Sequence, residues 1–152
     1  MENIMIKDIV LSDAEAIISP NLHDGTVDGI LLLPNNTVFI LVKNLDHQVY
    51  CLSLSGVDLL KMDDFRQGNI ILDITISVGE NICKWDFIDL CGYKEDDHVG
   101  LSLRAAKATQ NQTLSVRITP SYGGSLVCLC QSIEIEKDWV VKMANAFGAV
   151  SK

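Results

Sequence analysis

The sequence predicts an α+β fold, an antiparallel meander sheet of about six strands with two to three helices packed on one face. Segments rich in β-branched and aromatic residues follow one another between residues 27 and 54, separated by short turns, as in antiparallel neighbours. Near-strict alternation of apolar and polar residues at 69–78 indicates a strand with one buried face. Apolar residues spaced three or four apart occur between 82 and 110 and near residue 140, and helix-capping residues precede the 97–110 segment and the C-terminal segment.

Length and composition predict one domain spanning residues 1–152. Of the 152 residues, 48% are hydrophobic and 21% are charged, which is typical of a globular chain. A domain of this size buries enough surface to be stable without disulfides or metals. The sequence contains no internal repeat and no linker that would divide it.

The first expected element is a short helix after residue 12. Ser12 fits the N-cap position and Glu15 fits the third helical position, which together form a capping box. Pro20 would then end the helix, because the residue before a proline is disfavoured in the helical conformation.

Three strands are expected next, at 27–33, 37–43 and 49–54, joined by turns at 34–36 and 44–47. Residues 57–66 are expected to form one or two helical turns or an irregular crossing. The strand at 69–78 is expected to bury one set of alternating side chains, with Ile71 as the exception. That set consists of Ile70, Leu72, Ile74 and Ile76.

Residues 82–90 and 97–110 each allow a helix or a strand. In the first segment, apolar residues three apart favour a helix ending near Gly92, while every second residue also alternates as in a strand. In the second segment, Asp96 or Asp97 fits an N-cap position and the alanines that follow favour a helix. That helix would bury Leu101, Ala105 and Ala108 on one face.

The last expected elements are two strands and a helix. Strands are expected at 114–118 and 125–135, with a tight turn at 120–124. Asp138 is expected to cap a helix that ends at Gly148. Its apolar face would carry Trp139, Met143 and Phe147.

The charge composition points toward protein partners and away from nucleic acid. Twenty acidic and twelve basic residues give a net charge of −8, and the basic residues are scattered rather than clustered. An acidic surface favours a basic protein partner through charge steering. The sequence shows neither a secretory signal nor an apolar run long enough to cross a membrane, which predicts a cytoplasmic protein.

The five cysteines are expected to be reduced, and no metal or cofactor is expected. Cys128 and Cys130 share one face of the strand expected there, but their spacing matches none of the Cys-x-x-Cys patterns that hold zinc. A packing role is therefore favoured for this pair, and any further role stays open.

Candidate binding residues come from three polar segments, and none of these segments carries a known catalytic signature. His23 and Asp24 form a pair seen in metal-dependent phosphohydrolases, although the other ligands of such a site are absent and Asp24 also suits a turn. The 63–69 segment could hold a ligand, or its acidic residues could pair internally with its arginine. Tyr122 precedes a Gly-Gly pair without any phosphate-loop pattern. The candidates are His23, Asp24, Asp63, Asp64, Arg66, Asn69 and Tyr122.

The Leu-His-Asp sequence at 22–24, followed by Gly25, resembles a recurring opening of the first sheet strand in small bacterial proteins. Several of those families are immunity proteins of polymorphic toxin systems, and others are uncharacterised. The segments 63–72 and 120–124 also look like family signatures. The resemblance implies a β-rich interaction domain.

These observations predict a non-enzymatic protein-interaction domain, with an immunity-type role as its specific form. One alternative is a small ligand-binding module or enzyme whose pocket lies near His23, Asp24, Arg66, Asn69 and Tyr122. Another is a subunit of a homo-oligomeric assembly that pairs through apolar residues near the C-terminal helix.

Overall fold

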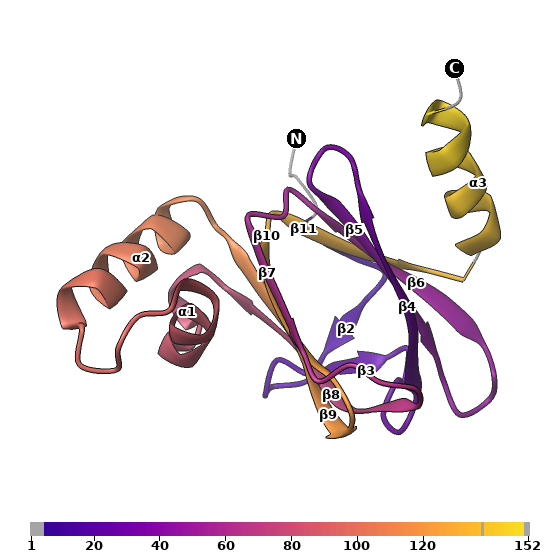
Figure 1. Cartoon of the computed structure of the whole chain (residues 1–152), viewed down its shortest axis with the longest axis horizontal. Coiled ribbons are helices and arrows are strands. Elements are labelled where there is room, and N and C mark those ends of the chain that lie inside the picture. Colours follow the sequence, from indigo (N-terminus) through magenta and orange to yellow (C-terminus); the bar gives the residue numbers. More distant parts are fainter. Residues whose placement is uncertain (1–4, 138, 151–152) are drawn as a thin grey trace.

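A computed structural model describes residues 5–137 and 139–150 (Figure 1). The first half of the chain is all strand: β1 (Ile6–Lys7), β2 (Val10–Leu11), β3 (Ile17–Ser19), β4 (Thr26–Leu33), β5 (Thr37–Lys43), β6 (Val49–Ser55), β7 (Leu59–Asp63) and β8 (Asn69–Val78). A short 3-10 turn, η1 (Gly79–Asn81), leads into the helices α1 (Lys84–Cys91) and α2 (His98–Gln110). The chain then forms β9 (Leu114–Tyr122), β10 (Ser125–Cys130), β11 (Ser132–Glu136) and α3 (Trp139–Val150).

The main sheet has nine strands in the order β1-β11-β6-β5-β4-β8-β9-β10-β7, and β2 and β3 form a separate pair. All neighbours in the main sheet are antiparallel except β1 and β11, which are parallel. The prediction of a six-stranded antiparallel meander is therefore wrong. The stretches 49–63 and 125–136 are each broken into two strands, β6 with β7 and β10 with β11, and the short parallel strand β1 is added at the edge. The local sequence pattern reveals neither difference.

The broken strands make the sheet fold back on itself. Only Gln131 separates β10 from β11, yet β10 pairs with β9 and β7 while β11 pairs with β6 and β1. The segments 49–63 and 125–136 consequently run beside each other along their whole length. The curled sheet encloses one core with almost no exposed surface, which includes Ile40, Leu52, Leu54, Ile74, Leu114, Val116, Leu126 and Cys128.

The helices do not share one face of the sheet, contrary to the prediction. α1 and α2 form an insertion between β8 and β9 that projects from one end of the molecule, while α3 lies at the other end (Figure 1). A second apolar cluster joins the insertion to the edge strands β7 and β10. Its buried members are Ile82, Phe87, Leu101, Ala108 and Leu129.

The expected helix after residue 12 is a hairpin between β2 and β3. The backbone N–H of Ser12 donates to the carbonyl of Ala16 at 2.8 Å, and the Ser12 hydroxyl accepts from the Ala16 N–H at 3.2 Å. Ala16 also bridges to Thr75 on β8. Pairing with a distant strand thus overrides the local capping pattern.

Two further expectations in the middle of the chain are wrong. Part of the 57–66 segment forms β7, because it pairs with β10 from the far end of the sequence. Within β8, Ile71 is buried while Leu72 is exposed, because the register shifts near Ile71 and reverses the alternation. Ile74 and Ile76 are buried as predicted.

The strands expected at 27–33, 37–43, 49–54 and 114–118 are confirmed, and both segments that allowed a helix or a strand form helices. Gly92 ends α1 in the left-handed conformation with φ 72°. Asp97 caps α2 by accepting a hydrogen bond from the Gly100 N–H at 2.9 Å. The expected 120–124 turn is shorter, since β9 continues to Tyr122.

The C-terminal helix is confirmed, but it continues through Gly148 rather than ending there. Lys142 holds α3 on β11 through ion pairs of 3.3 Å to both Glu134 and Glu136. The expected cap Asp138 and the side chain of Phe147 lie outside the described residues. In the described part of the chain, no helix is long and apolar enough to span a bilayer.

Candidate functional site

The predicted site residues lie in two groups. In the first, His23 Nδ1 lies 2.6 Å from the carbonyl oxygen of Leu72, and its Nε2 lies 3.6 Å from Asp24. His23 lines two surface pockets, and none of the other candidates lines either of them. Neither pocket therefore joins His23 to Arg66, Asn69 or Tyr122.

The second group is organised by Asn69, the buried first residue of β8. Its side-chain oxygen accepts hydrogen bonds from the N–H of Arg66 at 2.9 Å and from the N–H of Gly124 at 3.0 Å. Asn69 thus joins the loop before β8 to the turn after β9. These two hydrogen bonds give Asn69 a structural role.

Arg66 is also internally engaged. Its guanidinium pairs with Asp64 and lies over the Tyr122 ring, 5.6 Å from the ring centre. Hydrogen bonds to Asp64 and then to Tyr122 raise the pKa of Arg66. Asp63, the last residue of β7, is exposed and pairs in register with Ser125. A binding role for this group stays a prediction.

The cysteines form no metal centre in the described part of the chain, where no three His, Cys, Asp or Glu side chains converge. Cys51, Cys128 and Cys130 are buried, and Cys83 is exposed. Hydrogen bonding with Cys130, together with burial, raises the pKa of the Cys128 thiol. Protonated thiols of this kind behave as small apolar side chains.

The helical insertion presents a different surface, which sequence analysis did not single out. Val99 and Leu103 lie one turn apart on α2 and are 73% and 69% exposed. The opposite side of α2 carries Leu101 and Ala108, which are buried against the rest of the insertion and the sheet edge. Val99 and Leu103 therefore face away from the body of the protein. We call them, with the carboxylates 95–97 beside them, the insertion surface.

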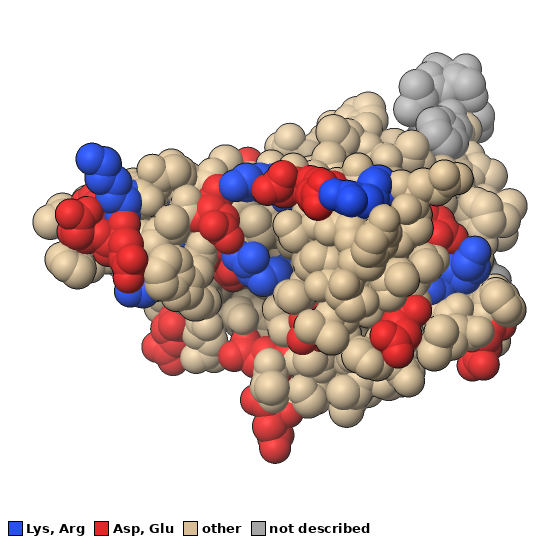
Figure 2. Space-filling model, turned by 60° about the horizontal axis from the view of Figure 1, so that its bottom comes forward, with Lys and Arg blue, Asp and Glu red and all other residues tan. Residues whose placement is uncertain are grey.

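The carboxylates of the insertion surface precede and begin α2. Glu95 pairs with Lys84 at 3.6 Å. Asp97 is used as the helix cap, and Asp96 forms no ion pair with any residue that the structure describes. Figure 2 shows that acidic side chains are spread over one face of the molecule, and that the basic ones there mostly adjoin acidic ones. The face has no continuous basic area.

A buried ion pair fixes the insertion to the sheet. Asp86 on α1 accepts hydrogen bonds from the Ser115 hydroxyl at 2.6 Å and from Arg117 Nε at 2.8 Å. Arg117 also pairs with Asp89 at 2.7 Å. Although burial of Arg117 opposes its charge, the hydrogen bonds to Asp89 and Asp86 raise its pKa. These contacts join α1 of the insertion to β9 of the sheet.

The exposed apolar positions could have been found in the sequence only after a helix had been chosen for 97–110. As a strand, Val99, Leu101 and Leu103 would share one face. If the segment is a helix, Leu101 lies nearly half a turn around the helix axis from Val99 and Leu103. Val99 and Leu103 then stand out as apolar residues opposite the buried face.

No protein-family model matches this sequence, and no curated protein matches it significantly. The likeness of residues 22–25 to immunity-type proteins is therefore an expectation from the sequence.

Proposed function

We propose that this protein is a non-enzymatic binding module that docks a basic protein partner on the insertion surface. The observation that carries the proposal is the pair of exposed apolar residues, Val99 and Leu103, bordered by the acidic segment 95–97 on a projecting, anchored element. Apolar residues rimmed by charge are typical of protein interaction sites.

The two features have separate roles in the proposed complex. Covering Val99 and Leu103 with partner side chains would supply affinity, since burial of apolar surface contributes about 25 cal/mol per Å². Asp96 and its neighbours would attract a basic partner over longer range and raise the association rate. The net charge of −8 acts in the same direction.

An immunity-type role is the specific form of this proposal. A toxin-neutralising protein needs a stable scaffold and a complementary charged face rather than catalytic groups. The resemblance at residues 22–25 supports such a role, and the basic partner would then be the toxin.

Site-specific photocrosslinking in the native cell tests the proposal. A photoreactive amino acid at position 103 should crosslink one partner that is rich in Lys and Arg. The same amino acid at position 45, where Leu45 is equally exposed on the turn after β5, is the matched control. Crosslinking at neither position, or equally at both, would contradict the proposed docking surface.

The captured partner then allows a quantitative check. The affinity of the purified pair should fall at least about tenfold in Leu103→Asp and stay unchanged in Leu45→Asp. Binding should also weaken as ionic strength rises, because the rim charges are solvent-exposed. A salt-independent affinity would refute the charge-steering part of the proposal.

A further inference from the structure

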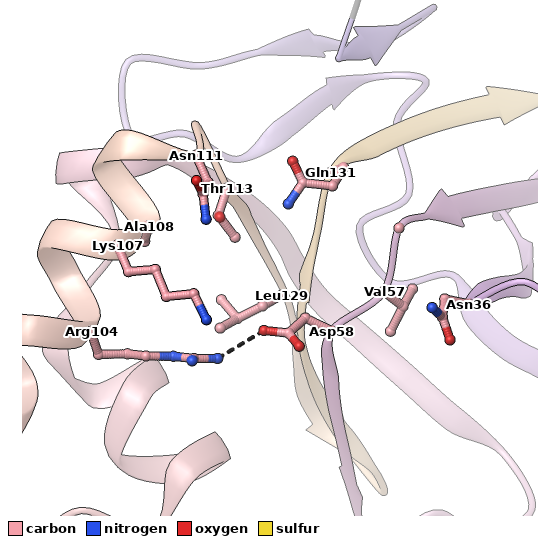
Figure 3. A pocket seen from close by; sticks show the side chains of 11 residues that line it. Asn36, Val57, Asp58, Arg104, Lys107, Ala108, Asn111, Thr113, Leu129 and Gln131 are labelled. Atoms are coloured by element: carbon pink, nitrogen blue, oxygen red, sulfur yellow. Dashed lines mark hydrogen bonds and ion pairs between the residues drawn. The ribbon is translucent and has the colours of Figure 1, made fainter.

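A pocket of about 320 Å³ lies where α2 meets the two bends of the curled sheet. One wall is α2, and the other consists of the 56–58 segment between β6 and β7 and of Gln131 between β10 and β11 (Figure 3). Leu129 forms part of the lining. The volume is at the small end of the roughly 300–1,000 Å³ range of ligand pockets.

Two basic side chains of α2 point into this pocket (Figure 3). Arg104, only 19% exposed, donates through Nη2 to Asp58 at 2.9 Å. The side-chain ammonium of Lys107, one turn further along, forms no ion pair or hydrogen bond with any residue that the structure describes. Asp58 therefore offsets one of the two positive charges, and the other remains available.

Neutral hydrogen-bonding side chains also line the pocket. Asn36, Asn111 and Gln131 contribute carboxamides, and Thr113 contributes a hydroxyl. In the part of the chain that the structure describes, none of these four side-chain groups has a hydrogen-bond partner. An ammonium that shares a pocket with amide and hydroxyl donors is suited to a carboxylate or phosphate oxygen.

We infer that this pocket binds a small organic anion through one carboxylate or phosphate group held by Lys107. The carboxamides of Asn111 and Gln131 donate further hydrogen bonds to the ligand, while Arg104 stays on Asp58. The overall charge of −8 opposes the long-range attraction of anions, so the affinity of the site must come from these short-range contacts within the pocket.

The anion site and the insertion surface use different residues of α2. Lys107 is exposed and lies one turn after Leu103, but it lines the pocket together with Arg104, and neither Val99 nor Leu103 does. A failure to bind anions would therefore not count against the proposed protein interaction. Lys107→Gln tests the anion site, and Leu103→Asp tests the docking surface.

Titrations of isotopically labelled protein followed by NMR test the site. Inorganic phosphate and succinate serve as the two probes, at constant ionic strength maintained with sodium chloride. The expected result is saturable shifts of the Gln131 and Asn111 side-chain amides and of the Lys107 ammonium with at least one probe. A response to phosphate alone assigns a phosphate ligand, and a response to succinate alone assigns a carboxylate.

The Lys107→Gln variant should lower the affinity at least about tenfold, because a charge-assisted hydrogen bond is lost. Lys61→Gln, which removes an exposed lysine that does not line the pocket, should leave the affinity unchanged. Equal weakening in both variants, non-saturating shifts, or shifts spread over all lysines would overturn the inference. Retained backbone spectra show that each variant is folded.

Discussion

Arg117 on β9 and Asp86 on α1 are 31 residues apart in sequence, and their side chains meet at 2.8 Å where the helical insertion joins the sheet. Asp86 is buried and Ser115 donates to its second oxygen, so the carboxylate is fully engaged. The position of the insertion surface therefore depends on an ion pair that lies remote from it.

Removing this carboxylate should destabilise the protein. Asp86→Ala leaves the Ser115 hydroxyl without its partner and leaves Arg117 paired with Asp89 alone. The substitution should lower the free energy of unfolding by about 2–3 kcal/mol. Urea denaturation measures the change. Asp89→Ala is the control, because Asp89 is 41% exposed and its pair with Arg117 contributes below about 1 kcal/mol. Equal effects of the two substitutions would contradict the assigned role of Asp86.

A side chain at Gly124 should not be tolerated. A Cβ atom there would lie 2.4 Å from the Phe65 ring and 2.8 Å from the Phe65 Cα. Gly124→Ala is expected to lower the unfolding free energy by about 1–3 kcal/mol, since backbone must move to relieve the clash. Gly29→Ala is the control, because its Cβ would meet only Leu41 side-chain atoms at 3.7 Å and beyond. A thermal unfolding midpoint that falls equally in both variants would refute this packing.

Asp97, the N-cap residue of α2, should stabilise the helix that carries the insertion surface. Asp97→Ala removes the acceptor of the Gly100 N–H and should cost about 1 kcal/mol. Hydrogen exchange at Gly100 should accelerate in this variant. Asp96→Ala, one residue earlier, leaves the cap in place and should change neither quantity appreciably. Unchanged exchange in Asp97→Ala would show that the cap contributes nothing.

Alkaline pH should destabilise the protein through Cys51. Burial raises the pKa of this thiol to about 11, with the nearby Glu136 and Glu134 adding to the rise and Lys142 opposing it. The folded state therefore keeps the proton that the unfolded state loses near pH 9. The resulting stability is present below that pH and is lost by pH 11, a change of about 2–3 kcal/mol.

The measurement is denaturant unfolding under reducing conditions at several values between pH 8.5 and 11. Cys51→Ala should be less stable at the lower end because of the cavity that it creates, and its stability should decline less steeply with pH. Cys91→Ala, which alters a half-buried thiol, should follow the wild-type slope. Parallel slopes for Cys51→Ala and wild type would contradict the assignment.

Local sequence patterns predicted the elements whose own residues indicate a buried face or a helix end. The 37–43 and 114–118 strands have alternating or β-branched residues, and α1 and α2 have recognisable end signals in Gly92 and Asp97. These signals arise within one element and need no knowledge of its neighbours. Seven of the strands could thus be located, at least in part, before the structure was known.

The errors arose where a distant segment determines the conformation. β7 is a strand because β10 pairs with it, and the Ser12–Ala16 hairpin forms against β8 rather than as a helix. The same holds for the candidate site. The contact of Arg66 with Asp64 is local and could be expected, whereas the separation of His23 from Arg66 and the pocket at Lys107 depend on how the sheet curls.

The pairing of β6 with β11 joins Ser55 to Ser132, about half the chain apart. Such distant pairings give a high contact order, which slows folding because a long loop must close before the contact is gained. During synthesis, the N-terminal meander of β4, β5 and β6 would wait on the ribosome with one edge unpaired until β11 emerged. The nascent chain would therefore be open to aggregation through that edge, and a chaperone that shields exposed strands should raise the yield of native protein.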